Sequence, residues 1–247
     1  MNAPNFIELA LFFLLTLLAE ILGTIGGFGS SLFFVPLGQF FFDFQTVLAL
    51  TGLLHVFSNT SKIYLFRKTI DWKIVLWLGL TSILFAIIGA VLTKVVDFQY
   101  TSLILGSFLI CFSVFFLIKP KFSINPTKQN SVISGGIAGF LAGFIGTGGA
   151  IRGLALASFN LEKSFFVGTS AMIDFGVDVS RTVIYLKQHY LQWNMLWYIP
   201  LLLITAFVGS YVGKLLLKKI EQETFKRIML GLILLTGLSL LVEHVIH

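Results

Sequence analysis

The sequence is poor in charged residues and in cysteine. Charged residues make up 11% of the 247 residues, against roughly 25% in an ordinary soluble domain. No soluble core could absorb the accompanying 57% of hydrophobic residues, so we expect an integral membrane protein. The single cysteine, Cys111, allows no internal disulfide and argues against a thiol metal cluster.

Other absences narrow the class further. Alternation of polar and apolar residues is lacking, which argues against a membrane barrel. No basic residue and no small-residue cleavage site accompany the first apolar run, so we expect it to belong to the mature protein. The glycine patterns have no preceding strand and no following lysine-serine pair, which makes a nucleotide site improbable. No cofactor is expected.

The apolar residues form eight segments. Most of them reach the ~20 residues needed to cross a bilayer. Backbone groups in lipid must be satisfied within the segment, so we predict helices. The segments run approximately over 6–42, 44–66, 72–96, 98–118, 131–158, 164–186, 193–217 and 223–245.

Two glycine runs indicate an internal duplication. GTIGGFGSSLFFVP begins at Gly23 and GFIGTGGAIRG at Gly143, an offset of about 120 residues. Such interrupted apolar segments at matching positions point to a transporter's central site. The glycines proposed to line it are Gly26, Gly27 and Gly29 with Gly146, Gly148 and Gly149. The matched pair Gly89 and Gly209 is expected to serve helix packing instead.

The distribution of lysine and arginine predicts the topology. If all eight segments crossed, the basic residues would divide equally between the two sides. If segment 131–158 instead enters and leaves on one face, twelve fall inside and only Lys94 and Lys187 outside, as the positive-inside rule expects. The twelve are Arg67, Lys68, Lys73, Lys119, Lys121, Lys128, Lys163, Lys214, Lys218, Lys219, Lys226 and Arg227.

Repeat symmetry extends this re-entrant prediction to segment 6–42. The fold class is then an all-α integral membrane protein of two inverted repeats. Each repeat has one broken, re-entrant, glycine-rich segment and three transmembrane helices. We place the repeats at 1–118 and 131–247, joined by a cytoplasmic linker at 119–130, in the cytoplasmic (inner) membrane.

The paired glycine motifs, each followed by a threonine-containing segment (ALTG at 49–52, VGTS at 167–170), resemble the sulfite exporter TauE/SafE family. The resemblance implies movement of a small anion such as sulfite or a sulfonate, usually outward. The second half departs from the usual pattern because Arg152 follows its glycines and no proline matches Pro36. A shifted substrate is therefore compatible with the motif.

Arg152 is the first candidate for binding the anion. An arginine at a helix centre costs roughly 2.5 to 3.5 kcal/mol on insertion scales, so it needs a compensating partner. An anionic substrate would serve, since the guanidinium fork suits the oxygens of sulfite or a sulfonate. The alternatives are that Arg152 reaches the cytoplasmic interface or pairs permanently with an acid such as Asp174.

Segment 164–186 carries a polar stripe at helical spacing: Ser170, Asp174, Asp178, Arg181 and Tyr185. Asp178 and Arg181 can neutralise each other, either as a structural pair or as part of the coupling machinery. That would leave Asp174 as a lone acid and a candidate carrier of a proton or cation.

The equivalent stripe in segment 44–66 is Thr51, His55, Asn59 and Lys62. His55 could relay a proton and Lys62 could attract an anion. The alternative is that His55 and Asn59 are interhelical hydrogen-bonding residues while Lys62 extends toward the headgroups. Thr51 and Thr169 are candidate hydroxyl donors to the substrate.

These observations predict a secondary transporter, not an enzyme, that works by alternating access and is driven by an ion gradient or the membrane potential. One alternative is a transition-metal permease using His55, Asn59, Asp174 and Asp178, although no dedicated metal site is expected. A less favoured one is an intramembrane enzyme or accessory subunit. Expected partners are the anion and membrane lipid, with no nucleic acid, and the sequence leaves a homodimer open.

Overall fold

A computed structural model describes residues 6–27, 29–92, 101–119, 122, 125–145 and 149–246. Every regular element in these ranges is helical. The first half contains α1 (Phe6–Gly26), α2 (Ser31–Gly38), α3 (Phe44–Phe66), α4 (Trp72–Ile74), the π-helical η1 (Val75–Gly79), α5 (Leu80–Leu92) and α6 (Thr101–Ile118). The second contains α7 (Lys128–Ile145), α8 (Gly149–Ser158), α9 (Lys163–Lys187), the 3₁₀ turn η2 (Trp193–Trp197), α10 (Tyr198–Lys218) and α11 (Gln222–Ile246).

Each half begins with a helix interrupted at its glycine run. α1 ends at Gly26 and α2 begins at Ser31, and between them Gly27 and Gly29 have φ angles of 76° and 94°. Only glycine adopts this backbone region without a steric penalty, so the chain can leave α1 there. In the second half α7 and α8 flank residues 146–148, so the predicted Gly146 and Gly148 lie outside the described residues.

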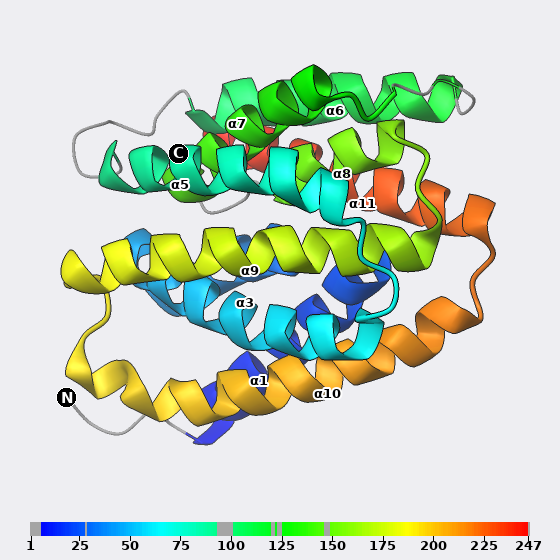
Figure 1. The fold of residues 1–247 in the computed structure, drawn as a ribbon. Helices are drawn as coiled ribbons and strands as arrows, with labels where there is room; N and C mark the ends of the chain where they lie inside the picture. The colour runs from blue at the N-terminus through cyan, green and yellow to red at the C-terminus, as the bar shows by residue number, and fades with distance from the viewer. Residues whose placement is uncertain are drawn as a thin grey trace.

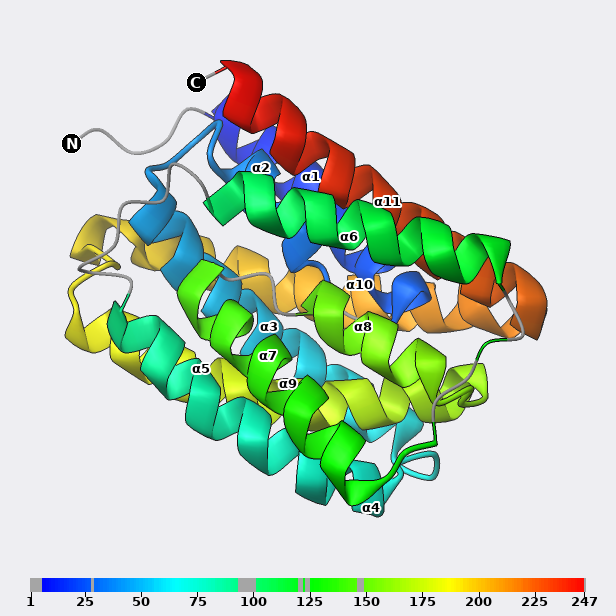
Figure 2. The ribbon, with the colours of Figure 1, turned by 90° about the horizontal axis from the view of Figure 1, so that it is seen from above.

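The helices of the two halves interlock (Figures 1 and 2). α3 and α9 pack together at the centre, α1 packs on α10, α7 on α5, and α6 on α11. The pattern is the same when the halves are exchanged. In the duplication α1 corresponds to α7 and α10 corresponds to α5, so the α1–α10 pair corresponds to the α7–α5 pair. The broken helix of each half therefore packs against a helix of the other half.

Glycines permit the close approach in both of these matched interfaces. A Cβ on Gly89 of α5 would lie 2.3 Å from the Phe140 carbonyl oxygen of α7. A Cβ on Gly209 of α10 would lie 2.7 Å from the Glu20 Cβ of α1. The predicted helix-packing role of Gly89 and Gly209 is confirmed.

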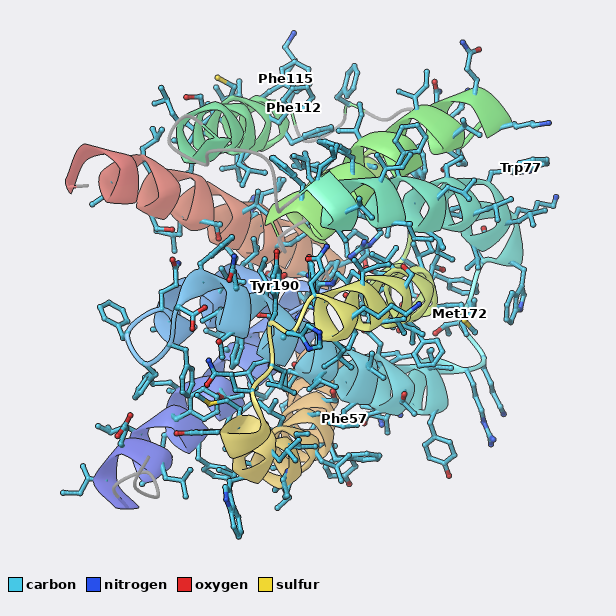
Figure 3. The ribbon with its side chains drawn as sticks, turned by 90° about the vertical axis from the view of Figure 1, so that its left-hand side faces the viewer. Phe57, Trp77, Phe112, Phe115, Met172 and Tyr190 are labelled. Carbon is cyan, nitrogen blue, oxygen red and sulfur yellow. The ribbon has the colours of Figure 1, made fainter. Side chains whose placement is uncertain are left out.

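The bundle exposes large apolar side chains on its outer surface and buries polar and charged side chains among the apolar residues of its interior. Leu11, Leu14 and Leu18 are each at least half exposed along one face of α1, and Figure 3 shows Phe112 and Phe115 pointing outward from α6 while Tyr190 lies between helices. Within the described residues, three helical stretches are long and apolar enough to span a membrane: Ile7–Gly26, Trp72–Leu92 and Met195–Lys218. α3 and α9, by contrast, carry the buried polar stripes.

The two ends of the bundle differ in charge. The start of α1 and the end of α11 lie at one end, with the α9 to η2 connection (Figures 1 and 2). The C-terminal ends of α3, α6, α8 and α10 lie at the other, which we call the basic end. Arg67, Lys68, Lys119 and Lys218 belong to this end, as predicted, whereas Lys94 and Lys121 lie outside the described residues.

This arrangement predicts a labelling pattern. In a Cys111→Ser background, Lys68→Cys and Lys218→Cys should react alike with a membrane-impermeant thiol reagent, because both lie at the basic end. His189→Cys lies at the opposite end. If the two lysine variants react only in permeabilised cells, His189→Cys should react in intact cells, and the reverse should hold if the lysine variants react in intact cells. A shared pattern for Lys218→Cys and His189→Cys would contradict a bundle that spans the membrane along its helix axes.

Candidate functional site

Both central helices begin at an acidic cap, at matching positions in the two halves. Asp43 accepts hydrogen bonds from the Thr46 amide at 3.0 Å and the Thr46 hydroxyl at 2.7 Å at the start of α3. Burial raises the pKa of Asp43, but these bonds outweigh it and hold the pKa below its usual value. Glu162 accepts from the Ser164 amide at the start of α9. The caps fix the residue at which each helix starts, and therefore the position of its polar stripe along the bundle axis.

Glu20 of α1 forms the first part of the buried network. Its carboxylate is fully buried and lies 2.7 Å from the Lys62 Nζ of α3. Ser30 donates a hydrogen bond to its Oε2 at 2.7 Å, and Ser58 donates to its Oε1 at 2.5 Å. Ser210 of α10 donates to Oε1 at 3.2 Å. One carboxylate thus connects α1, the glycine break, α3 and α10.

His55 connects Glu20 to the second half. Its Nε2 lies 3.2 Å from the Ser30 Oγ, and its Nδ1 lies 3.3 Å from Asp178 Oδ2 on α9. Because the Ser30 hydroxyl donates to Glu20, it can only accept from His55. The Nδ1 contact with Asp178 then requires a second proton, on the ring or on the carboxylate. The chain from Glu20 to Asp178 is therefore a hydrogen-bonded path whose geometry depends on protonation.

Asp178 is the most heavily bonded acid of α9. Its Oδ1 accepts from Arg181 Nε at 2.7 Å and its Oδ2 from Asn59 Nδ2 at 2.7 Å. Arg181 also donates to the Ala142 carbonyl of α7 at 3.3 Å. The predicted Asp178–Arg181 pair is present, and it ties α9 to α3 and α7.

Arg152 of α8 forms the second part of the network. Its Nη2 contacts Asp174 Oδ1 in a buried ion pair, and its Nε donates to the Ser170 hydroxyl at 3.4 Å. Ser170 in turn donates to Asp174 Oδ2 at 3.2 Å. The Arg152 Nη1 is buried and has no hydrogen-bond partner among the described residues. One donor of this guanidinium is therefore available to another acceptor.

The prediction that Asp174 is a lone acid is wrong. The carboxylate of Asp174 is paired with Arg152, which was the alternative considered for that arginine. The error has a physical cause: Arg152 lies on a different helix, and helical spacing reveals only the neighbours on the same helix. The carrier role of Asp174 remains a prediction, now in competition with an ion pair.

The other predicted residues lie outside this network. The Thr51 hydroxyl donates to the Val47 carbonyl of its own helix at 2.6 Å, and the Thr169 hydroxyl accepts from the Asp71 amide at 2.9 Å. Their role as substrate donors stays a prediction. Gly26 is the last residue of α1 and Gly149 the first of α8. Gly29 lies directly against His55, since a Cβ there would be 3.0 Å from the imidazole Cε1.

The metal-permease alternative finds little support in this geometry. In the part of the chain that the structure describes, no group of three or more His, Cys, Asp or Glu side chains could hold a metal. His55 and Asn59 do meet Asp178, but Asn59 presents its amide nitrogen and Arg181 occupies the other carboxylate oxygen. The orientation of the Asn59 amide is assigned from its hydrogen bonds.

Comparison with known proteins decides the family. The model of the family described as "Sulfite exporter TauE/SafE" matches residues 12–240. The chain belongs to the TauE/SafE family. It is 26% identical to the probable membrane transporter protein YunE of Bacillus subtilis over 95% of this chain and 98% of that protein. It is 31% identical to a probable membrane transporter protein of Haemophilus influenzae over 43% of this chain and 41% of that relative. No solved structure matches significantly.

The sequence reasoning missed Glu20, which is central in this TauE/SafE member. Its position in the duplication corresponds to Phe140, because Gly209 packs on Glu20 as Gly89 packs on Phe140. A signal was available in the sequence: an acid inside the apolar run 6–42, where an unpaired carboxylate would be costly. The repeat therefore carries an acid in one half and an aromatic ring in the other.

The Gly29 contact yields a stability prediction. Gly29→Ala should destabilise the protein by about 1 to 2 kcal/mol, because an L-residue is strained at this positive φ and its methyl group would press on His55. Gly231→Ala is the matched control, since a Cβ there meets nothing within 4 Å and alanine favours helix. Thermal unfolding midpoints in detergent measure both. Equal midpoints for the two variants would contradict the assigned turn.

The Glu20–Lys62 pair yields a double-mutant prediction. Glu20→Gln should cost about 3 to 5 kcal/mol because it leaves the buried Lys62 ammonium unpaired, whereas Glu20→Gln with Lys62→Met should recover much of the loss. Glu8→Gln, an exposed change on the same helix, should have little effect. Unfolding in detergent measures the cycle. Simple additivity of the two single changes would exclude the direct pairing.

Proposed function

We propose that this TauE/SafE family member moves a small sulfur oxyanion, such as sulfite or a sulfonate, across the membrane by alternating access. Arg152 is the anion ligand and Asp174 is its exchange partner. The observation that carries the proposal is the buried Arg152 guanidinium, one donor nitrogen of which has no hydrogen-bond partner in the part of the chain that the structure describes. The family description and the names of the two relatives agree with transport.

The position of Arg152 suits an oxyanion. It lies in the first turn of α8, three residues after the helix begins at Gly149. The amides of a helix N-terminus point toward the preceding break and favour negative charge there. A guanidinium adds paired N–H donors that match two oxygens of the same anion. Gly149 keeps this helix start free of a side chain.

Competition for Arg152 provides a way to couple the anion to a proton. The described residues bury three cations, Lys62, Arg152 and Arg181, and three carboxylates, Glu20, Asp174 and Asp178. These six charges balance one another, and the additional proton between His55 and Asp178 adds one positive charge. An oxyanion that binds Arg152 displaces the Asp174 carboxylate, which would then be buried without a partner. Because such a charge is costly, Asp174 takes up a proton, and one proton travels with each bound anion.

The matched helix pairings support two repeats of opposite orientation. Helices α1 and α2 correspond to α7 and α8, and an odd number of crossings in each half would invert the second half. The basic end then faces the cytoplasm under the positive-inside rule. We therefore propose repeats at 1–118 and 131–247, with the linker 119–130 on the cytoplasmic side of the inner membrane. Export is the direction in the family description.

Variants of the two partners separate substrate binding from coupling. Arg152→Ala should abolish most stabilisation of the purified protein by sulfite or sulfoacetate, and Arg152→Lys should retain part of it, because lysine keeps the charge but loses the fork. Asp174→Asn should still bind and exchange anion in proteoliposomes but should no longer accumulate it when a pH gradient is imposed.

The double variant Arg152→Ala with Asp174→Asn is the control for folding, because it removes both charges together. It should be folded and inactive. Anion stabilisation that survives Arg152→Ala would exclude the arginine as ligand, and normal pH-driven uptake by Asp174→Asn would remove the proton role. Stabilisation by divalent metals that is lost in His55→Ala would favour the metal permease. Flux in liposomes that contain only this protein excludes an accessory role.

A further inference from the structure

A basic pocket lies at the basic end of the bundle, away from the Arg152 site. Its volume is about 490 Å³, and it lies between the end of α3, the start of α9 and the end of α10. Five cations line it, together with the hydroxyl-bearing Thr69 and Ser164, and its described lining residues include no carboxylate. The five are Arg67, Lys68, Lys163, Lys214 and Lys218. We call this the basic pocket.

Several of these cations are held in place by groups that leave their charge uncompensated. The Lys214 Nζ donates to the Leu65 carbonyl at 2.8 Å and lies 5.4 Å from the Phe66 ring. The Lys163 Nζ donates to the Ile220 carbonyl. The Arg67 guanidinium lies 5.6 Å from the Tyr64 ring. Among the described residues, no ion pair involves a cation of the basic pocket.

Two buried phenylalanines separate the basic pocket from the interior. Phe66 lines the pocket and lies one helical turn beyond Lys62, which is 3% exposed. Phe166, 1% exposed, lies just beyond the pocket residues Lys163 and Ser164, and a Cβ on Gly27 would be 2.7 Å from its ring. The pocket is therefore one aromatic layer away from both the glycine break and the buried network.

We propose that the basic pocket is a second anion-binding site, which captures an oxyanion at the basic end before it enters the interior. This inference rests on the proposed function, in that the same anion is the cargo of the Arg152 site. The recognised chemistry is a compact oxyanion group, which a free sulfite or sulfonate and the phosphate of an anionic lipid headgroup share. We assign the free anion as the occupant, because five cations cluster in a cavity with no acid among its described lining residues, one aromatic layer away from the buried network.

Such a pocket should affect the rate at which the anion associates with the protein more than it affects which anion is transported. A cleft lined by one sign of charge raises the local anion concentration and speeds association by a factor of 10 to about 10³. The effect falls with ionic strength because salt screens exposed charges. The pocket should thus lower the KM for the anion. The kcat should depend on steps at the interior Arg152 site and should not change.

The test compares two double variants in phosphatidylcholine vesicles. Arg67→Gln with Lys218→Gln removes two pocket cations that donate to no backbone carbonyl described above. Lys73→Gln with Lys219→Gln removes two cations from the same end that do not line the pocket. The pocket variant should raise the KM for sulfite roughly tenfold, change kcat by less than about twofold and lose most of the salt dependence of KM. The control should match wild type, and a pocket variant that also matches wild type overturns the proposal.

Calorimetric binding of sulfite to the purified protein separates this inference from the proposed function. Wild type should bind two sulfite ions, the pocket variant should lose one, and Arg152→Ala with Asp174→Asn should lose the other. Absence of sulfite flux by the wild type, with sulfite still bound in the basic pocket, would refute the proposed function alone. Unchanged stoichiometry in the pocket variant would refute the pocket alone.

Vesicles that contain phosphatidylglycerol distinguish the two sources of the oxyanion. If the pocket takes the free anion, the KM defect of the pocket variant is present without phosphatidylglycerol, and adding this lipid raises the KM of wild type by competition. If wild type needs phosphatidylglycerol for activity and the variant differs only when this lipid is present, the occupant is the headgroup and the capture role is overturned.

Discussion

The structure depends on keeping every buried charge paired inside an otherwise apolar protein. Six side chains of Lys, Arg, Asp and Glu are almost completely buried in the described residues, three of each sign. Each must face a partner, because a single unpaired charge at this depth would cost several kcal/mol. α3 and α9 therefore occupy the centre, where their polar stripes face each other and the breaks, while α1, α5 and α10 present apolar side chains outward.

The glycines allow this charge network to form. The turn at Gly27 and Gly29 returns the chain onto α1, so that Ser30 reaches Glu20 and His55 at once. Gly209 lets α10 approach the backbone beside Glu20. These glycines therefore serve the contacts of the buried acid, and for this reason a glycine pattern predicts the fold better than the substrate.

The sequence predicts this architecture well because its signals are local. The apolar segment 44–66 coincides with α3, and 164–186 differs from α9 by one residue at each end. The pair of Asp178 with Arg181 follows from helical spacing. Contacts between different helices do not follow from helical spacing. Arg152 meets Asp174, and Lys62 meets Glu20, only after the breaks and the packing of separate helices bring them together. Gly146 and Gly148 lie outside the described residues, so their roles stay predictions.

The division of the ion pairs between the halves has a consequence for biosynthesis. Glu20 pairs with Lys62 inside the first half, while Arg152 with Asp174 and Asp178 with Arg181 pair inside the second. Within the buried network, the contacts that cross between the halves are hydrogen bonds of Asn59 and Ser210 and the contact of His55 with Asp178. Each half can thus enter the bilayer with its buried acids and bases already paired. The packing of α10 against α1 can form later, after the second half has been synthesised.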